Sequence, residues 1–404
     1  MTIENSISKK NNSLLVLSKN LSPSKEGAYL VNNFCGQVLY EYSALQKRSS
    51  QNIYVCGNLQ ELQQLDQPFY IIQELSSNYT PLPSNGQLVK LGQVPVVIHN
   101  AGVYFRHFFE GENYFEQIQE EHVFQALTES TKPTKALRKG IYLTDVSKET
   151  INHQEEALHY RLLRCSSNLT GPTDNFRATD RQIITALNEA ASATFKHPTA
   201  LNHVLAQIYT NIKRPDSNKE KKAKIKAHSD KTKDMPIEGL IAFCTFYDST
   251  NFDQLQPSKT DAYDWCYKKN SGLTRLHFKL KNTVEDEDWV KEFSVTLYPN
   301  SVFLIPLSTN RLYTHAIKPS LLNVDRIPTR MGYVVRCSNQ EAVFMQEQTY
   351  LKENGDLIPL EPMTSDTMTE LRHSYYQENA MEKKVQYKKV HFSMNTGDYQ
   401  KPIY

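Results

Sequence analysis

Residues 228–246 have the sequence HSDKTKDMPIEGLIAFCTF, in which a His-x-Asp pair precedes a charged turn and an apolar run. On extended backbone, side chains two residues apart point to the same face. We therefore expect His228 and Asp230 to lie side by side next to a buried strand. One more histidine from elsewhere in the chain would complete a two-histidine, one-carboxylate set, which leaves coordination positions open on Fe(II).

Residues 294–320, SVTLYPNSVFLIPLSTNRLYTHAIKPS, contain a candidate for that histidine. We expect a β hairpin here that ends in an aromatic residue and then His315. Arg330 and Arg336 follow in RMGYVVRCS (residues 330–338), and their even separation predicts that both lie on one face of a strand. Two guanidinium groups inside a protein are costly unless anions meet them. A dicarboxylate cosubstrate would do so, since arginine binds carboxylates in a bidentate manner; ordinary salt bridges are the alternative.

The chain around these motifs favours β structure with a few helices. Turn-punctuated apolar segments precede and follow residues 228–246, and the spacing in DRQIITALNEAAS (residues 180–192) predicts a helix with Asp180 as its N-cap. Residues 94–146 predict a strand, a helix, a polar loop at 128–140 and another strand. We expect an α+β architecture, with an antiparallel β-sandwich or barrel supported by helices.

The motifs divide the chain into three predicted regions. Residues 1–92 form a β-containing N-terminal extension whose role the sequence does not indicate. Residues 93–345 hold all the candidate site residues. Residues 346–404 form a tail that is helix-permissive from Ser365 and is expected to fray over its last dozen residues.

Composition excludes several classes of protein. The 404 residues include 46 Lys plus Arg against 44 Asp plus Glu, a formal charge of +2, so any attraction to nucleic acid must come from local clusters. Six cysteines without a C-x2-C pair argue against a disulfide framework and a structural zinc site. No apolar run approaches the roughly 18 residues that a membrane helix needs, and the first residues do not resemble a secretory signal. We therefore expect no membrane contact and an intracellular location, cytoplasmic or nuclear.

Together the motifs resemble the AlkB-like family of Fe(II)/2-oxoglutarate-dependent dioxygenases, the oxidative dealkylases of nucleic acids. The resemblance covers residues 94–338. VLAQIYTN (residues 204–211) is similar to the family's strand whose tyrosine hydrogen-bonds the cosubstrate; Tyr209 takes that place, with Gln207 where the family has Asn. Gly332 and Val334 stand where the family's Arg-x-Asn-x-Thr-x-Arg has Asn and Thr.

The resemblance implies a double-stranded β-helix (jelly-roll) core with supporting helices. It also implies Fe(II) as cofactor, with 2-oxoglutarate and dioxygen as cosubstrates. The activity would be oxidative demethylation or hydroxylation of a nucleobase in nucleic acid. The residues that it assigns are His228, Asp230 and His315 as catalytic metal ligands, Arg330 for the distal carboxylate of 2-oxoglutarate, Arg336 near its metal-side carboxylate, and Tyr209 for a further hydrogen bond.

One departure from the family affects the substrate. In nucleobase dealkylases an acidic residue two positions after the metal aspartate commonly reads the base edge, and Thr232 stands there in this chain. The lysine segment, defined here as Lys219 to Lys226, precedes the metal motif and would attract a phosphate backbone; a solvated loop is the alternative. Candidates for stacking on bases are Tyr104, Phe105 and Tyr142.

Three other functions stay open. A related enzyme would hydroxylate a protein side chain or a small molecule. A catalytically silent binding protein would keep the same barrel as a scaffold. A zinc hydrolase would use the same histidines, but no Glu general base accompanies them as in His-Glu-x-x-His. The sequence does not indicate the oligomeric state.

Overall fold

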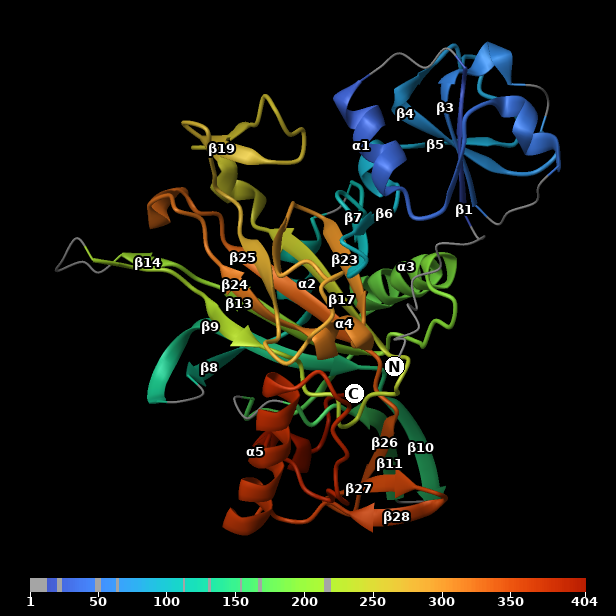
Figure 1. Ribbon diagram of the computed structural model, residues 1–404. Helices are drawn as coiled ribbons and strands as arrows, with labels where there is room; N and C mark the ends of the chain where they lie inside the picture. Colours follow the sequence, from blue (N-terminus) through green and yellow to red (C-terminus); the bar gives the residue numbers. More distant parts are fainter. Residues whose placement is uncertain are drawn as a thin grey trace.

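The protein is a mixed α+β chain in which sheets predominate (Figure 1). The computed structural model describes residues 13–19, 24–47, 52–62, 65–111, 113–129, 132–152, 155–165, 169–213 and 219–404. Within these ranges, no helix is both long enough and apolar enough to cross a membrane.

Two sheets make up the centre of the molecule. The large sheet has the strand order β12-β9-β13-β25-β17-β23-β7-β6, with β8 paired to β9, and the small sheet has the order β16-β24-β21-β22. The strands of the large sheet are β6 (Val96–Ile98), β7 (Gly102–Phe105), β8 (Gln125–Glu129), β9 (Lys132–Thr144), β12 (Asp174–Asn175), β13 (His203–Tyr209), β17 (Leu240–Tyr247), β23 (Ser301–Pro306) and β25 (Arg330–Arg336). Those of the small sheet are β16 (Ile225–His228), β21 (Arg275–Leu280), β22 (Glu292–Thr296) and β24 (Tyr313–Lys318).

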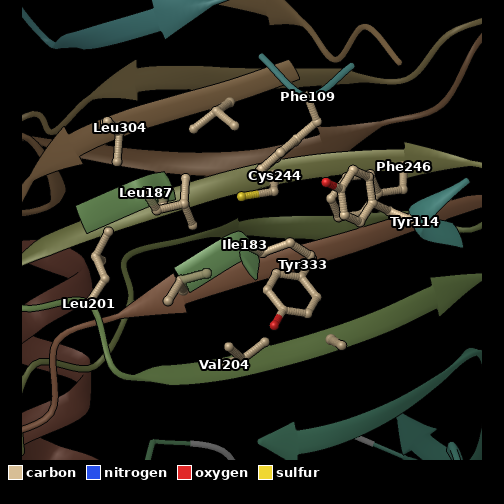
Figure 2. Close-up of a cluster of buried hydrophobic side chains, with 14 of the residues drawn as sticks. Phe109, Tyr114, Ile183, Leu187, Leu201, Val204, Cys244, Phe246, Leu304 and Tyr333 are labelled. Atoms are coloured by element: carbon tan, nitrogen blue, oxygen red, sulfur yellow. The ribbon is translucent and has the colours of Figure 1, made fainter. Parts of the chain in front are cut away.

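Apolar clusters cover both faces of the large sheet. On one face, side chains such as Cys244 and Tyr333 pack with helices α2 (Tyr114–Glu121) and α3 (Ala178–Thr194), as Figure 2 shows for part of the cluster. On the other face, Phe243 belongs to a cluster that also contains Phe278 of the small sheet. Because successive side chains of a strand point to opposite faces, a strand buried on both faces must be apolar throughout. This explains why seven of the eight residues of β17 are apolar or aromatic, with Thr245 as the exception.

The N-terminal region is a small parallel sheet with the strand order β2-β1-β3-β4-β5. Its strands are β1 (Ser13–Leu17), β2 (Gln37–Leu39), β3 (Asn52–Asn58), β4 (Phe69–Ser77) and β5 (Gly86–Val89), accompanied by α1 (Lys25–Asn33), η1 (Tyr42–Lys47), η2 (Leu59–Glu61) and η3 (Leu91–Gln93). Arg106 Nη1 lies 2.8 Å from Glu26 Oε2 and connects α1 to the central part of the molecule.

A third antiparallel sheet joins the middle of the chain to the tail. Its order is β10 (Ser147–Asn152), β11 (Glu155–Leu162), β26 (Gln340–Met345), β27 (Gln348–Glu353) and β28 (Asp356–Pro359). Hairpin β26–β27 crosses the predicted boundary between residues 345 and 346, and the division into three regions stays a prediction. The short elements left to name are η4 (Ser249–Phe252), β18 (Gln256–Pro257), β19 (Trp265–Tyr267), β20 (Asn270–Ser271), η5 (Val324–Arg326) and η6 (Thr396–Tyr399).

The tail contains the predicted helix, α5 (Ser365–Ala380), but the expected fraying of the last dozen residues is wrong. Ser393, Asn395 and Asp398 are buried. The carboxylate of Asp398 accepts hydrogen bonds from the side chains of Ser393 and Asn395. These local bonds, with the backbone carbonyl of Asp398 accepting from Thr349, hold the chain end against β27.

Several local expectations differ from the structure. The predicted polar loop at residues 128–140 lies mostly in strands β8 and β9, because β8 pairs with β9 from Lys132 to Gly140. Pairing of β9 with β13 begins at Arg138. Strands β22 and β23 belong to different sheets rather than one hairpin, and α4 (Leu307–Leu312) precedes β24. Helix α3 begins before Asp180, whose carboxylate accepts a hydrogen bond from the Arg177 amide.

The three aromatic residues considered for base stacking are also buried. The exposed fractions of Tyr104, Phe105 and Tyr142 are 3, 4 and 4%. Tyr104 donates its hydroxyl proton to the carbonyl of Thr296. The prediction that they stack on bases is therefore wrong, because their rings are packed in the interior.

Candidate metal centre

His228, Asp230 and His315 converge at one end of the small sheet. His228 is the last residue of β16 and lies directly opposite His315 on β24, with ring centroids 4.5 Å apart. Oδ1 of Asp230 lies 3.6 Å from Nε2 of His228 and 3.7 Å from Nε2 of His315. One potential ligand atom from each residue falls within a 4.8 Å cluster. The three side chains thus offer two imidazoles and one carboxylate to a common point.

Burial and charge prepare these groups for metal binding. Asp230 and His315 are buried, while His228 is partly exposed and marks the open side of the cluster. Burial and the neighbouring His228 lower the pKa of His315 to about 3, so its ring is neutral at physiological pH. Burial by itself would raise the pKa of Asp230, but Arg336 and the two histidines hold it well below its usual range. A neutral imidazole and an ionised carboxylate are the forms that ligate metals.

Arg336 is tied to the metal-motif carboxylate. From the end of β25, its Nε and Nη2 each lie 2.7 Å from Oδ2 of Asp230, so two guanidinium donors share one carboxylate oxygen. Oδ1 of the same carboxylate faces the two histidines. Arg336 therefore orients Asp230 and compensates its charge, and its predicted place near the metal-side carboxylate of 2-oxoglutarate stays a prediction.

Arg330 occupies the opposite end of β25 and has a different environment. Its side chain is buried, with Cζ 4.1 Å from the centroid of the Tyr209 ring. Within the described ranges, Nε and Nη2 of Arg330 have no hydrogen-bond partner. The Tyr209 hydroxyl donates to Oε1 of Gln207 at 2.9 Å, so Gln207 positions the tyrosine. A buried guanidinium without an anion is costly, which fits a site for a carboxylate ligand.

Gly332 leaves space beside Arg330 and Tyr209. A Cβ atom at this position would lie 2.9 Å from Nη1 of Arg330 and 3.3 Å from Cε2 of Tyr209. The absence of a side chain therefore makes room for Arg330 to lie along its own strand against Tyr209. An asparagine here would force the guanidinium to another position.

The C-terminal helix supports the loop that carries the metal motif, which the sequence did not reveal. Oδ1 of Asn379 accepts a hydrogen bond from the amide of Ser229 at 2.7 Å, between His228 and Asp230. Oε1 of Glu378 accepts from both the amide and the hydroxyl of Thr232. The position that reads the base edge in nucleobase dealkylases is thus engaged by α5. No local signal marks either residue, because the contact spans about 150 positions of sequence.

A buried ion cluster anchors the following turn. Asp234 accepts a bidentate interaction from Arg164 and an ion pair from Lys233 at 2.7 Å. Although burial opposes ionisation, these two cations lower the pKa of Asp234. Arg164 also donates to the carbonyl of Val390, so the metal-motif loop and the tail share one network.

The lysine segment lies beside the central sheets. Strands β14 (Ile212–Lys213) and β15 (Glu220–Lys221) pair in antiparallel orientation, and residues 214–218 lie outside the described residues. Nζ of Lys222 donates to the carbonyl of Ser320, and the other lysines of the segment are exposed. The segment therefore offers positive charge to a partner.

A second group of ligand-type residues contains Glu121, His122 and Asp180. Nδ1 of His122 lies 2.8 Å from Asp174 and Nε2 lies 2.8 Å from Asp180. Burial opposes the charged ring, but these hydrogen bonds outweigh it and raise the pKa of His122 to about 9. An imidazolium that donates both protons has no lone pair for a metal. We interpret this group as a structural ion cluster that joins α2 to α3.

Comparisons with known proteins add little to this picture. No protein-family model matches the chain, and no curated protein matches it. A solved structure described as "The structure of OsALKBH1" is similar with a TM-score of 0.34 and 12% sequence identity, over 58% of this chain and 96% of that chain. Similarity at this level carries no argument about fold or activity.

Proposed function

We propose that the protein is an Fe(II)/2-oxoglutarate-dependent dioxygenase that demethylates or hydroxylates a nucleobase in nucleic acid. The observation that carries the proposal is the pairing of two features on one strand. Arg336 lies against a two-histidine, one-carboxylate cluster. Arg330 lies buried on the same face and, among the residues that the structure describes, has no anionic partner. A dicarboxylate that chelates a metal at one end and needs a cation at the other fits this arrangement.

The arrangement of the sheets supports a double-stranded β-helix core. The site lies between the large sheet, which supplies both arginines, and the small sheet, which supplies both histidines. Side chains of the two sheets pack together in one apolar cluster. A core of two facing antiparallel sheets is the architecture of a jelly roll.

The residues of the chain would prepare the reaction by binding and orientation. When bound, Fe(II) supplies the oxidation of a C–H bond by dioxygen, coupled to oxidative decarboxylation of 2-oxoglutarate. His228, Asp230 and His315 would hold the metal, and Arg336 keeps Asp230 ionised and oriented. Arg330 would bind the distal carboxylate, with Tyr209 against it. Burial of Arg330, His315 and Asp230 keeps water away and strengthens these interactions.

Nucleic acid as the substrate rests on the charge of the lysine segment. Lys219 and Lys226 are exposed, and we propose that they contact phosphates. Replacing both with glutamine should weaken binding of all sequences alike. It should make the slope of log affinity against log salt shallower by about 0.7 to 0.9 per lost contact. An unchanged slope would remove this support.

A second candidate function is hydroxylation of a protein side chain or a small molecule. The observation in its favour is the engagement of Thr232 by Glu378, which removes the position that reads a base edge in nucleobase dealkylases. Substrate recognition would then depend on other residues around the open side of His228.

Two measurements test the proposal. Anaerobic titration of the protein with Fe(II) and then 2-oxoglutarate should produce the visible absorption of a metal-bound 2-oxo acid, and His315→Ala should abolish it. Succinate formation is then compared between methylated oligonucleotides and methylated peptides. Absence of 2-oxoglutarate binding would refute the dioxygenase. Stimulation by peptides alone would select the second candidate.

A further inference from the structure

A basic cavity lies next to Tyr209, outside the candidate metal centre. Its volume is about 610 Å³, and its cationic lining residues are Arg138 of β9 and Lys221, Lys222 and Lys224 of the lysine segment. Glu220 is the acidic residue among those that line it. We call the four cationic residues and the cavity between them the basic vestibule. A concave site with an excess of one charge concentrates ions of the opposite sign.

Strand register connects the vestibule to Arg330. Tyr209 of β13 is directly opposite Arg138 on one neighbour, β9, and opposite Arg330 on the other, β25. Directly opposite residues of an antiparallel pair project to the same face of the sheet. The three side chains therefore form a row, with one arginine on each side of the tyrosine. Adjacent strands are about 4.8 Å apart, so the two arginines are separated by roughly 10 Å at their backbones.

Both arginines of this row lack partners for buried nitrogen atoms. Among the residues that the structure describes, Nε of Arg138 has no hydrogen-bond partner, and the same holds for Nε and Nη2 of Arg330. Buried donors are normally satisfied, and exceptions call for a ligand or water. One buried nitrogen of Arg138 and two of Arg330 are thus available, among the described residues, to bind anions at successive positions along the row.

A narrow gap of about 10 Å³ lies between the vestibule and Arg330. Tyr209, Ala223 and Pro319 line both spaces, and Arg330 lines only the gap. The rest of the gap is lined by the apolar Ile317, Ile327 and Pro328 and by the polar Asn211 and Thr274. A small change in these side chains would join the vestibule to the carboxylate-binding end of the site.

We propose that the basic vestibule is the access route of the dicarboxylate cosubstrate, which Arg138 and the lysines attract and pass to Arg330. The inference rests on the proposed function, because it takes 2-oxoglutarate as the ligand of Arg330. It gives Lys221, Lys222 and Lys224 a role separate from that of Lys219 and Lys226, which do not line the cavity.

Stopped-flow binding of 2-oxoglutarate to the anaerobic Fe(II) protein tests the proposal without turnover. Arg138→Gln should lower the association rate constant at low salt by about threefold to tenfold, as loss of electrostatic steering predicts, and should flatten its dependence on ionic strength. The dissociation rate constant should change little. Arg372→Gln, an exposed arginine of α5, is the matched control and should leave both constants unchanged.

A second variant tests the gap itself. Ala223→Phe adds bulk where the two spaces meet and should slow association and dissociation together, leaving the equilibrium affinity nearly unchanged. A plug in the route gives this signature, whereas damage to the binding site weakens affinity. Thermal unfolding of Ala223→Phe checks that this variant folds. If it does not fold, the association kinetics of Arg138→Gln decide whether the vestibule is the access route.

The outcomes separate the vestibule from the enzyme class. Unchanged association kinetics in Arg138→Gln, with normal binding by the wild-type protein, would overturn the vestibule and leave the dioxygenase intact. A loss of oligonucleotide affinity in Arg138→Gln without a kinetic effect on 2-oxoglutarate would also overturn it, and would assign the cavity to the phosphate backbone. Failure of the wild-type protein to bind 2-oxoglutarate would refute both proposals.

Discussion

Arg336 and Arg330 lie on the same face of β25, six residues apart, and both are buried, yet their surroundings differ in one essential respect. Arg336 forms an ion pair with Asp230 in which Nε and Nη2 both contact Oδ2, while its Nη1 has no hydrogen-bond partner among the described residues. Arg330 rests on the ring of Tyr209, and within the described residues two of its nitrogen atoms have no partner. The charge of Arg336 is paired within the protein itself, whereas Arg330 is prepared for an anion.

This difference separates what each arginine contributes. A paired buried charge is part of the folded structure, because removing its partner leaves an uncompensated ion. An unpaired buried charge lowers the stability of the ligand-free protein. Binding of an anion removes this destabilisation, so the site is preorganised for that ligand. Breaking the ion pair at the metal end should therefore lower the free energy of unfolding. Removing Arg330 at the other end should instead lower the affinity for 2-oxoglutarate.

The largest expected effect is that of Asp230→Ala. The substitution removes a metal ligand and also leaves Arg336 buried without its carboxylate, which should lower the free energy of unfolding by about 3–5 kcal/mol. His228→Ala should abolish metal binding as well but cost little stability, because His228 is partly exposed. Urea unfolding and Fe(II) titration measure the two effects. Equal stability losses in the two variants would contradict the role assigned to Arg336.

Arg330→Ala should show the opposite pattern. It removes an unpaired buried charge, so the free energy of unfolding should stay the same or rise. Binding of 2-oxoglutarate should weaken by about 2–5 kcal/mol, because one carboxylate is left buried and unpaired. Arg326→Ala, a partly exposed arginine that stacks on Tyr267 at 4.3 Å, is the control and should change affinity much less. Calorimetry of 2-oxoglutarate binding distinguishes them, and reversed effects would mean that the register of β25 is wrong.

His122 extends the comparison to a third buried cation, which is fully paired. Its pKa is raised to about 9 from 6.5, so protonation stabilises the folded state. The contribution is fully present below pH 6.5 and is lost as the pH rises through 9. The midpoint of thermal unfolding should therefore fall over this range by more in the wild-type protein than in His122→Asn. Parallel profiles for the two proteins would show that the Asp174–His122–Asp180 cluster stores no such stability.

The smallest expected effect is on Fe(II) affinity, when the hydrogen bond between α5 and the metal-motif loop is removed. Asn379→Ala removes the acceptor of the Ser229 amide, and a hydrogen bond contributes about 0.5–1.5 kcal/mol, so Fe(II) affinity should fall severalfold. Affinity for 2-oxoglutarate at Arg330 should be affected less than in Arg330→Ala. Arg372→Ala on the exposed side of α5 is the control. If Asn379→Ala binds Fe(II) as tightly as the control, α5 packs against the metal-motif loop without positioning it.

Local spacing was sufficient to predict several features of the site. His228 and Asp230 are two residues apart and Arg330 and Arg336 six apart, so alternation along extended backbone predicted shared faces, and the structure has each pair on one face. The helix over residues 180–192 was predictable because its apolar residues recur at the three- and four-residue spacing of a helix. These properties depend on near neighbours in the chain. The roles of the residues as ligands stay predictions.

Contacts between distant segments could not be predicted in this way. The polar composition of residues 128–140 favoured a loop, but pairing between β8 and β9 makes most of it strand. Pairing of β9 with β13 then brings Arg138 beside Tyr209. The sequence led us to expect a ligand anion at both arginines, yet Asp230 already pairs with Arg336 across 106 positions. Glu378 and Asn379 gain their contacts with the metal-motif loop across about 150 positions.

By itself, the sequence determined a β-rich α+β chain, a His-x-Asp motif and two arginines that share a strand face. Tertiary structure decided which of those arginines is paired, which residues hold the metal-motif loop, and where a basic cavity meets the buried end of the site. The physical reason is that side-chain direction follows from backbone alternation within a few residues. Ion pairing and burial depend instead on strand register and packing between segments that the chain order keeps far apart.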